Sequence, residues 1–317
     1  MTIAEEVRIP FGDITLAGTL HRPGSETTEL SPAPALVMLQ GSGPDDRDSW
    51  GYFGPIRDAF LGAGLAVLSW DKPGVGQSTG AWTDQTLFDR ADEAQTALRW
   101  LRAQPGIDPT WTGIWGHSQG GWIGPLAASR DPELAFLIVN SGPSVNVHAQ
   151  DLFGIEHVLR ADGATDGEIA AALDFMESLH AAAVANEPYD EVRKRLLQPA
   201  AGTPAATYFG DVSADLWHFL CINSNPIFEP ADALGRIHCP VLALFGERDD
   251  LVPVTTSAED FRRIFAREGA PELTVRIFPE ADHRIRVGLD RQFAPGYLDT
   301  MVTWLQRQIG PGDGALA

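Results

Sequence analysis

The segment 116–120 (GHSQG) places a serine between two glycines at a spacing that suits a nucleophile. A serine on a sharp strand-to-helix turn adopts a strained backbone, and glycines two residues away on either side prevent clashes with the neighbouring chain. An apolar run at 113–115 precedes this turn, and a helix-like run at 121–128 follows it. Ser118 is therefore the candidate nucleophile. The alternative is a glycine-rich helix start in which Ser118 only caps the helix.

A serine hydroxyl is a weak nucleophile at neutral pH, so an imidazole must take its proton and a carboxylate must orient that imidazole. Where such sites are built on alternating strands and helices, the acid follows a strand downstream of the serine. Three carboxylates follow the apolar run 241–245, namely Glu247, Asp249 and Asp250. Their spacing alone does not choose among them.

The candidate base is His283, the one histidine of eight that lies beyond this acidic loop. It follows the run 273–278, from where a loop could return to Ser118. A solvent-exposed loop histidine is the alternative, and it becomes the weaker one once serine, acid and histidine all fit. His117 is the immediate neighbour of Ser118, so we expect its side chain to point elsewhere and to be structural.

The elements that would position these residues form a regular alternation. Short apolar runs, which are typical of strands covered on both faces, occur at 35–39, 65–70, 111–115, 134–139, 241–245 and 273–278. Helical patterns separate them, the clearest being the stripe Leu87, Ala91, Ala94, Leu98 and Leu101. Segments 5–10 and 14–21 alternate as an edge hairpin would. The sequence predicts an α/β fold, a mostly parallel sheet with helices on both faces and an active site at the strands' carboxyl ends.

The alternation stops between about residues 143 and 236, where helical signals dominate. The pattern Thr165 to Glu168 predicts a helix start, and an apolar stripe that includes His180 follows it. We expect His180 to be a core or groove residue rather than a ligand. The predicted division is a core domain of residues 1–143 and 237–317, with a helical cap of residues 144–236 inserted in it.

Together these motifs resemble the α/β-hydrolase superfamily, and in particular bacterial cytosolic serine esterases with a helical cap between the sixth and seventh core strands. Segment 39–44 (LQGSGP) is similar to the family's oxyanion loop, and segment 71–78 (DKPGVGQS) is similar to its Asp-x-Arg-Gly-x-Gly-x-Ser turn. The GHSQG turn, the Gly-x-x-Asp-x-x-Val-Pro segment at 246–253 and the Asp-His pair at 282–283 complete the likeness, which spans nearly the whole chain.

The resemblance implies that Asp249 is the acid and that the backbone N–H groups of Ser42 and Gln119 form the oxyanion hole. Two departures stand out, Gln40 where the family usually has histidine and Pro73 where it usually has arginine. Neither position is catalytic in the implied mechanism. They bear on loop geometry and specificity.

The implied activity is hydrolysis of a carboxylic ester through an acyl-enzyme, with a small-molecule ester or acyl compound as substrate. An exopeptidase or amidase, or a carbon–carbon bond hydrolase, would use the same triad. A non-catalytic binding protein of the same fold is a further alternative. Trp50, Tyr52, Trp217 and His218, with Phe219 beside them, are candidates for an apolar acyl or alcohol pocket.

Composition argues against several other classes. The formal charge is −20, from 43 acidic and 23 basic residues, so nucleic acid and anionic membranes would be repelled on average. We expect no cofactor or metal, because segment 74–80 lacks nucleotide-loop spacing and segment 45–48 (DDRD) suits a solvated or arginine-paired loop. No signal-like or membrane-spanning run is evident, which favours a cytoplasmic location. A homodimer remains an open alternative.

Overall fold

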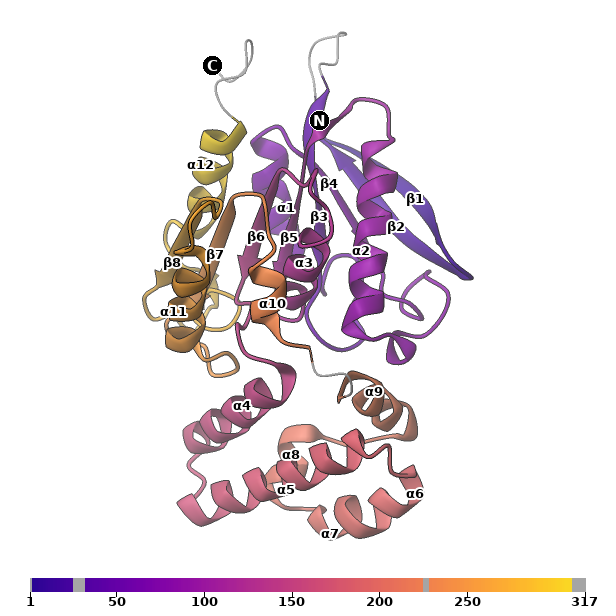
Figure 1. Cartoon of the computed structure of the whole chain (residues 1–317), viewed down its shortest axis with the longest axis vertical. Coiled ribbons are helices and arrows are strands. Elements are labelled where there is room, and N and C mark those ends of the chain that lie inside the picture. Colours follow the sequence, from indigo (N-terminus) through magenta and orange to yellow (C-terminus); the bar gives the residue numbers. More distant parts are fainter. Residues whose placement is uncertain (1, 25–31, 225–227, 310–317) are drawn as a thin grey trace.

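A computed structural model describes residues 2–24, 32–224 and 228–309 (Figure 1). One sheet carries eight strands in the order β1-β2-β4-β3-β5-β6-β7-β8, and all the pairs from β4 to β8 are parallel. The strands are β1 (Ile3–Phe11), β2 (Ile14–Arg22), β3 (Ala33–Leu39), β4 (Ala66–Trp70), β5 (Ile107–His117), β6 (Phe136–Asn140), β7 (Val241–Gly246) and β8 (Leu273–Phe278). The six apolar runs are confirmed as β3 to β8.

The edge hairpin is also confirmed, since β1 pairs antiparallel with β2 around a turn that brings Phe11 opposite Ile14. β2 joins the sheet antiparallel to β4. A second, small antiparallel pair, β9 (Arg286–Val287) with β10 (Gln292–Phe293), lies in the loop between β8 and the last helix.

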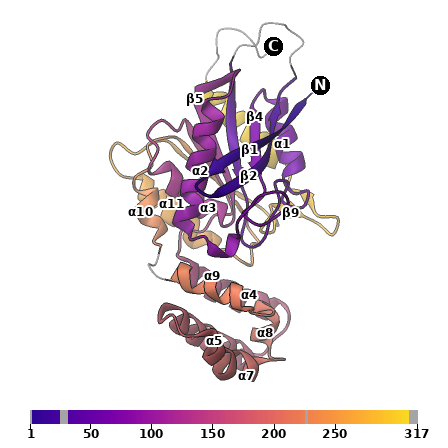
Figure 2. The ribbon, with the colours of Figure 1, turned by 90° about the vertical axis from the view of Figure 1, so that its right-hand side faces the viewer.

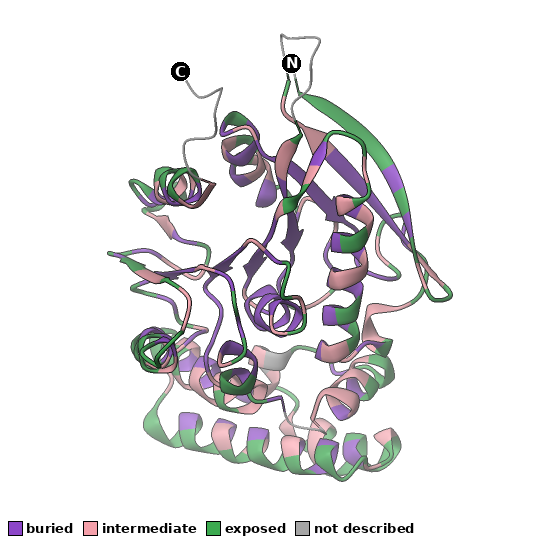
Figure 3. Cartoon of the chain, turned by 45° about the horizontal axis from the view of Figure 1, so that its top comes forward, coloured by how far each residue is buried: buried purple, intermediate pink, exposed green. Residues whose placement is uncertain are grey.

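Helices cover both faces of the sheet because the strand residues alternate between two apolar clusters. On β3, Val37 packs into one cluster and Leu36 and Met38 into the other. The first cluster includes residues of α2 (Leu87–Arg102), α3 (Gly120–Ala128), α10 (Pro230–Leu234) and α11 (Val254–Phe265). The second includes residues of α1 (Phe53–Gly62) and α12 (Tyr297–Ile309). In Figure 3 the buried residues follow the strands and the inner sides of these helices.

All five residues of the predicted α2 stripe are buried in the first cluster. Thr86 caps this helix through a capping box with Asp89. A 3-10 turn, η1 (Trp82–Asp84), leads into it. The 16-residue helix therefore lies where its apolar spacing predicts.

Between β6 and β7 the described chain forms helices and no strand. They are α4 (Val147–Ala161), α5 (Asp166–Val184), α6 (Tyr189–Val192), the π-helical turn η2 (Arg193–Leu197), α7 (Gln198–Ala200), α8 (Pro204–Phe209), α9 (Ala214–Ser224) and then α10, given above. We call α4 to α9 the helical insert. It lies beyond one end of the sheet (Figures 1 and 2) and has two small apolar clusters of its own. The predicted capping box of α5, Thr165 with Glu168, is confirmed.

Helix α10 lies within the residue range predicted for the cap. Its Ala233 and Leu234 nevertheless pack into the first apolar cluster, against the sheet. The predicted domain boundaries stay a prediction. None of the described helices is both long and apolar enough to cross a membrane.

Candidate active site

Ser118 lies on a tight turn between β5 and α3, with a backbone φ of 54°. Positive φ is strained for a residue with a side chain. The flanking glycines permit the turn by close approach: a Cβ atom on Gly116 would lie 2.2 Å from the Gly120 carbonyl oxygen, and one on Gly120 would lie 2.5 Å from that of Leu39. Gln119, not Ser118, is the N-cap residue of α3, and no side chain caps this helix. Ser118 is therefore not the residue that caps this helix.

Asp249 and His283 are joined by a hydrogen bond of 2.7 Å between Oδ2 and Nδ1. The other carboxylate oxygen of Asp249 accepts the N–H groups of Leu251 and Val252, each at 2.9 Å. Its side chain is fully buried and that of His283 is 13% exposed. Both oxygens are thus in use, which fixes the carboxylate and, through it, the imidazole.

The other two carboxylates of the acidic loop lie elsewhere. Glu247 accepts the backbone N–H of Glu280 at 3.0 Å, and both Glu247 and Asp250 are exposed. Of the three alternatives left open by spacing, Asp249 is the one that contacts His283.

His117 connects the serine turn to His283 by packing. The rings of His117 and His283 have centroids 4.9 Å apart. A Cβ atom on Gly41 would lie 3.7 Å from His117 Cδ2 and 3.8 Å from Ser118 Oγ. These contacts bring the serine, the histidine and the 41–43 loop to one end of the sheet. Within the described part of the chain, no hydrogen bond joins Ser118 Oγ to His283.

His117 itself is buried and has the structural setting that we expect. Its Nδ1 lies 3.0 Å from Asn140 Nδ2, and Asn140 Oδ1 accepts the Tyr297 hydroxyl at 2.8 Å. Burial holds the pKa of His117 well below its ordinary value, and the nearby His283 and Arg284 lower it further. A neutral ring whose Nδ1 accepts from Asn140 fits both observations.

Lys72 links the two segments in which the oxyanion donors are expected. Its buried ammonium donates to the carbonyl oxygens of Gly41 and of Gly43, the latter at 2.8 Å, and lies 3.4 Å from Gln119 Oε1. Burial lowers the pKa of Lys72 well below its ordinary value. Gly41 and Gly43 flank Ser42, so one side chain contacts both sides of the expected oxyanion hole. Sequence reasoning missed this role, although Lys72 stands inside the recognised 71–78 turn.

A cavity of about 300 Å³ opens beside the serine turn, residues 116–120. Ser42, Gln119 and Trp122 contribute to its wall from the sheet side, and residues of α4, α5 and α9 contribute from the helical insert. His180 lines it, which confirms the groove position expected for this residue. A small-molecule site of this kind is concave, mostly apolar and built from few polar groups.

Residues 46–288, more than half of the chain, match the family described as serine aminopeptidase S33. The chain belongs to the S33 family of α/β-hydrolases. The match includes the serine turn, the Asp249–His283 pair and the helical insert. It also confirms the fold and the superfamily that the sequence motifs predict.

Several relatives of this S33 protein have names that describe an activity. A monoacylglycerol lipase of Mycolicibacterium smegmatis is 25% identical over 280 residues, covering 88% of this chain and 90% of the lipase. The esterase EstD of Thermotoga maritima is 24% identical over 287 residues, covering 86% of this chain and 59% of EstD.

Solved structures show the same fold. The Pyrococcus furiosus esterase Pf2001 superposes with a TM-score of 0.63 at 19% identity, covering 97% of this chain and 92% of that one. A proline iminopeptidase of Mycobacterium smegmatis gives 0.59 at 20% identity, with 96% and 98% covered. At such identities the likeness concerns the fold.

The four residues expected to form the pocket of this S33 protein lie elsewhere. Trp50 is 71% exposed, and Tyr52 is buried against Phe53, Trp115 and His117. Trp217 packs into a cluster inside the helical insert, and the side chain of His218 points to solvent near Asp84. None of the four lines the cavity, whereas Phe219 does. Aromatic content alone could not tell which face of a helix is turned toward the cavity.

Gln40, the first departure from the family pattern, hydrogen-bonds to two backbone carbonyl groups and to one arginine. Its amide nitrogen donates to the carbonyl oxygen of Trp70 and, at 3.3 Å, to that of Asp46. Its amide oxygen accepts from Arg90 at 3.4 Å. An amide that donates and accepts suits this buried position between the 41–43 loop and α2.

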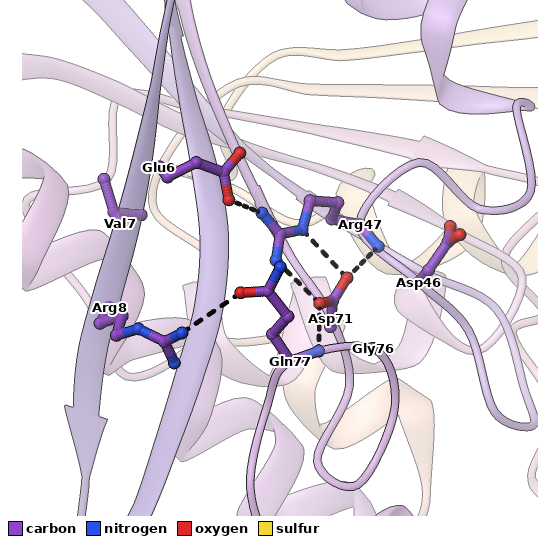
Figure 4. A pocket seen from close by; sticks show the side chains of 8 residues that line it. All are labelled: Glu6, Val7, Arg8, Asp46, Arg47, Asp71, Gly76 and Gln77. Atoms are coloured by element: carbon purple, nitrogen blue, oxygen red, sulfur yellow. Dashed lines mark hydrogen bonds and ion pairs between the residues drawn. The ribbon is translucent and has the colours of Figure 1, made fainter.

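The 45–48 segment of this S33 protein is arginine-paired, as expected. The guanidinium of Arg47 donates two hydrogen bonds to Asp71, at 2.8 and 3.0 Å, and forms an ion pair with Glu6 (Figure 4). Arg57 pairs with Asp48. An open groove of about 780 Å³ runs beside these pairs, and none of the candidate catalytic residues lines it. Among residues 2–24, 32–224 and 228–309, no His, Cys, Asp and Glu side chains are grouped as a metal site.

Proposed function

We propose that this protein hydrolyses carboxylic esters of small molecules, with Ser118 as nucleophile, His283 as general base and Asp249 as the group that orients the base. The observation that carries the proposal is the 2.7 Å hydrogen bond between Asp249 and His283 Nδ1. It directs Nε2 of the imidazole away from the acid, on the side available for proton transfer. The positive φ of Ser118 supports the same assignment.

In the proposed reaction, His283 takes the Ser118 proton as Oγ attacks the ester carbonyl. The N–H groups of Ser42 and Gln119 stabilise the negative oxygen of the tetrahedral intermediate. His283 then returns the proton to the departing alcohol, which leaves the acyl group on Ser118. A water molecule, deprotonated by His283, attacks the acyl-enzyme and releases the acid and the free serine.

The ester preference rests on the names of the relatives, a monoacylglycerol lipase and an esterase. The family description, a serine aminopeptidase, favours amide cleavage as the second candidate. The triad serves both reactions, because the histidine can return the proton to a leaving alcohol or to a leaving amine. A carbon–carbon bond hydrolase and a catalytically silent binding protein are the remaining alternatives.

A fluorophosphonate probe followed by a substrate panel tests the proposal. We expect the probe to label Ser118 alone, and Ser118→Ala to abolish turnover while leaving the fold intact. Chromogenic esters of increasing chain length should turn over much faster than aminoacyl amides of matched size. Labelling at another residue refutes the nucleophile. Comparable rates on amides favour the aminopeptidase alternative, and a single burst without turnover favours a binding protein.

A further inference from the structure

Among the described residues that line the cavity beside the serine turn, one is a carboxylate, Asp151 in the second turn of α4. Neighbouring polar groups are already in use. Asn146 caps α4 and donates to Glu229 at 2.9 Å, and Gln150 donates to the Leu251 carbonyl oxygen at 3.0 Å. Within the part of the chain that the structure describes, Asp151 has no hydrogen-bond or ion-pair partner.

The histidines that share this cavity do not neutralise Asp151. The rings of His148 and His180 are stacked with centroids 3.8 Å apart, and His148 Nε2 lies 3.2 Å from Glu177. Burial lowers the pKa of His180, and the adjacent His148 lowers it further. A protonated pair in this stack would place two like charges in contact, which is unfavourable.

Burial alone raises the pKa of Asp151 to about 7. A carboxylate in a mostly apolar cavity is stabilised when a cation lies beside it and balances its charge. A hydroxyl group would leave the charge unbalanced. Tyr208 of α8, which lies within electrostatic range of Asp151 and Asp250, stays neutral because burial raises the pKa of its phenol.

The rest of the cavity suits the organic part of such a cation. Trp122, Phe219 and Phe228 line it, and aromatic faces attract ammonium groups. The net charge of −20 draws cations toward the molecule as a whole. An aromatic, apolar cavity with one unpaired carboxylate is thus complementary to an organic ammonium group.

We propose that Asp151 binds an ammonium group carried by the substrate, so that the preferred esters are cationic. This substrate class rests on the ester hydrolysis proposed above, because the same cavity reaches Ser42 and Gln119. The ammonium group would lie on either the acyl or the alcohol side of the ester, and the experiment uses one substrate pair for each side.

The first experiment compares cationic esters with neutral esters of the same shape. Butyrylcholine is paired with 3,3-dimethylbutyl butyrate, and the 4-nitrophenyl ester of 4-(trimethylammonio)butanoate with that of 5,5-dimethylhexanoate. A quaternary ammonium keeps its charge at every pH. For at least one pair we expect kcat/KM to be about tenfold higher for the cationic ester, a size expected for one partly desolvated charge pair. The preference should increase from pH 6 to pH 8 as Asp151 ionises.

Two variants separate Asp151 from the general charge of the insert. Asp151→Asn should bring the ratio of the two kcat/KM values close to one. Glu156→Gln removes a carboxylate from the same helix, where Glu156 pairs with Arg160 at the surface, and should keep the wild-type ratio. An equal ratio in wild type and Asp151→Asn overturns the proposal.

A binding measurement distinguishes failure of the proposed ammonium site from failure of the proposed ester hydrolysis. With Ser118→Ala, calorimetry should show tighter binding of the cationic ester than of its neutral partner, and Asp151→Asn in that background should remove the difference. Hydrolysis of both esters without preference, together with equal binding, refutes the ammonium site alone. Tighter binding of the cation without turnover by the wild type refutes the hydrolase proposal alone.

Discussion

Among single residues, Asp249 is distinguished by its two carboxylate oxygens, which accept hydrogen bonds from different partners. One holds His283, and the other is fixed by two backbone N–H groups. An asparagine at this position would keep the shape but would favour the wrong tautomer of the imidazole. We therefore expect Asp249→Asn to lower kcat by roughly four orders of magnitude. Steady-state kinetics on a chromogenic ester measures this loss.

The matched control is Asp250→Asn, one residue along and exposed. It should leave kcat nearly unchanged. A large loss in Asp250→Asn with a small one in Asp249→Asn would assign the acid to Asp250 instead.

Lys72 gives the second prediction at this scale. Its ammonium holds the carbonyl groups on either side of Ser42 and contacts the side chain of Gln119. Removing it should misplace donors that act on the transition state, so Lys72→Met should lower kcat by roughly a hundredfold and change KM little. Lys194, the other lysine, is exposed on the helical insert, and Lys194→Met is the control. A rise in KM at constant kcat would contradict the positioning role.

Individual residues also show where sequence reasoning stopped. The GHSQG turn and His283 could be found because glycine spacing and chain order are visible in the sequence. Asp249 could be separated from Glu247 and Asp250 only by resemblance, because all three share one loop. Lys72 and the cavity residues depend on which segments meet in space, and no local pattern carries that information.

At the scale of elements, the next prediction concerns the N-terminus of α3, which packs closely against the loop after β6. A Cβ atom on Gly121 would lie 2.3 Å from the Cα of Gly142, in the loop after β6. Backbone cannot move aside as a side chain can, so Gly121→Ala should push α3 away from β6 and disturb the Ser118 turn. We expect the free energy of unfolding to fall by about 1–3 kcal/mol, with loss of activity.

Gly167→Ala on α5 is the control for this prediction, since a Cβ atom there would meet nothing within 4 Å. Alanine is the better helix former, so this variant should be neutral or slightly stabilising. Urea denaturation of both variants distinguishes a local clash from a general effect of added methyl groups. Equal stability of the two would refute the close-packing argument.

The elements themselves were largely predictable. Continuous apolar runs predicted β3 to β8, because these strands are covered on both faces. The spacing of apolar residues from Leu87 to Leu101 predicted α2, because this helix is buried on one face. The pocket was not predictable in the same way. Helix α9 turns Trp217 into the insert and Phe219 toward the cavity, and both are aromatic.

For the molecule as a whole, buried histidine couples stability to pH. The pKa of His117 lies well below 6.5 in the folded state. Below about pH 6.5, His117 is therefore protonated in the unfolded chain while it is still neutral in the folded protein. The contribution of His117 to stability should therefore fall as the pH is lowered from 7 to 5, by up to about 1.4 kcal/mol per pH unit. Asp151, whose pKa burial raises to about 7, contributes in the opposite direction, so the His117 part is read from the difference between wild type and variant. Urea denaturation at several pH values measures the slope.

His117→Gln should give a shallower slope, because glutamine does not titrate but can still accept from Asn140. His21, whose pKa burial also lowers, remains in the variant and keeps part of the slope. An unchanged slope in His117→Gln would show that the acid sensitivity arises elsewhere.

The walls of the cavity come from two parts of the chain, each with its own apolar clusters. The serine turn, Ser42 and Trp122 belong to the sheet and its packed helices, whereas α4, α5 and α9 are held together by their own apolar clusters. Under the proposed function, the residues that cleave the bond and those of the insert that contact the substrate thus belong to different stretches of the chain. An exchange of residues 147–224 for another helical segment would redraw the range of substrates while the reactive groups kept their arrangement, which makes the insert the natural unit for diversification and for engineering.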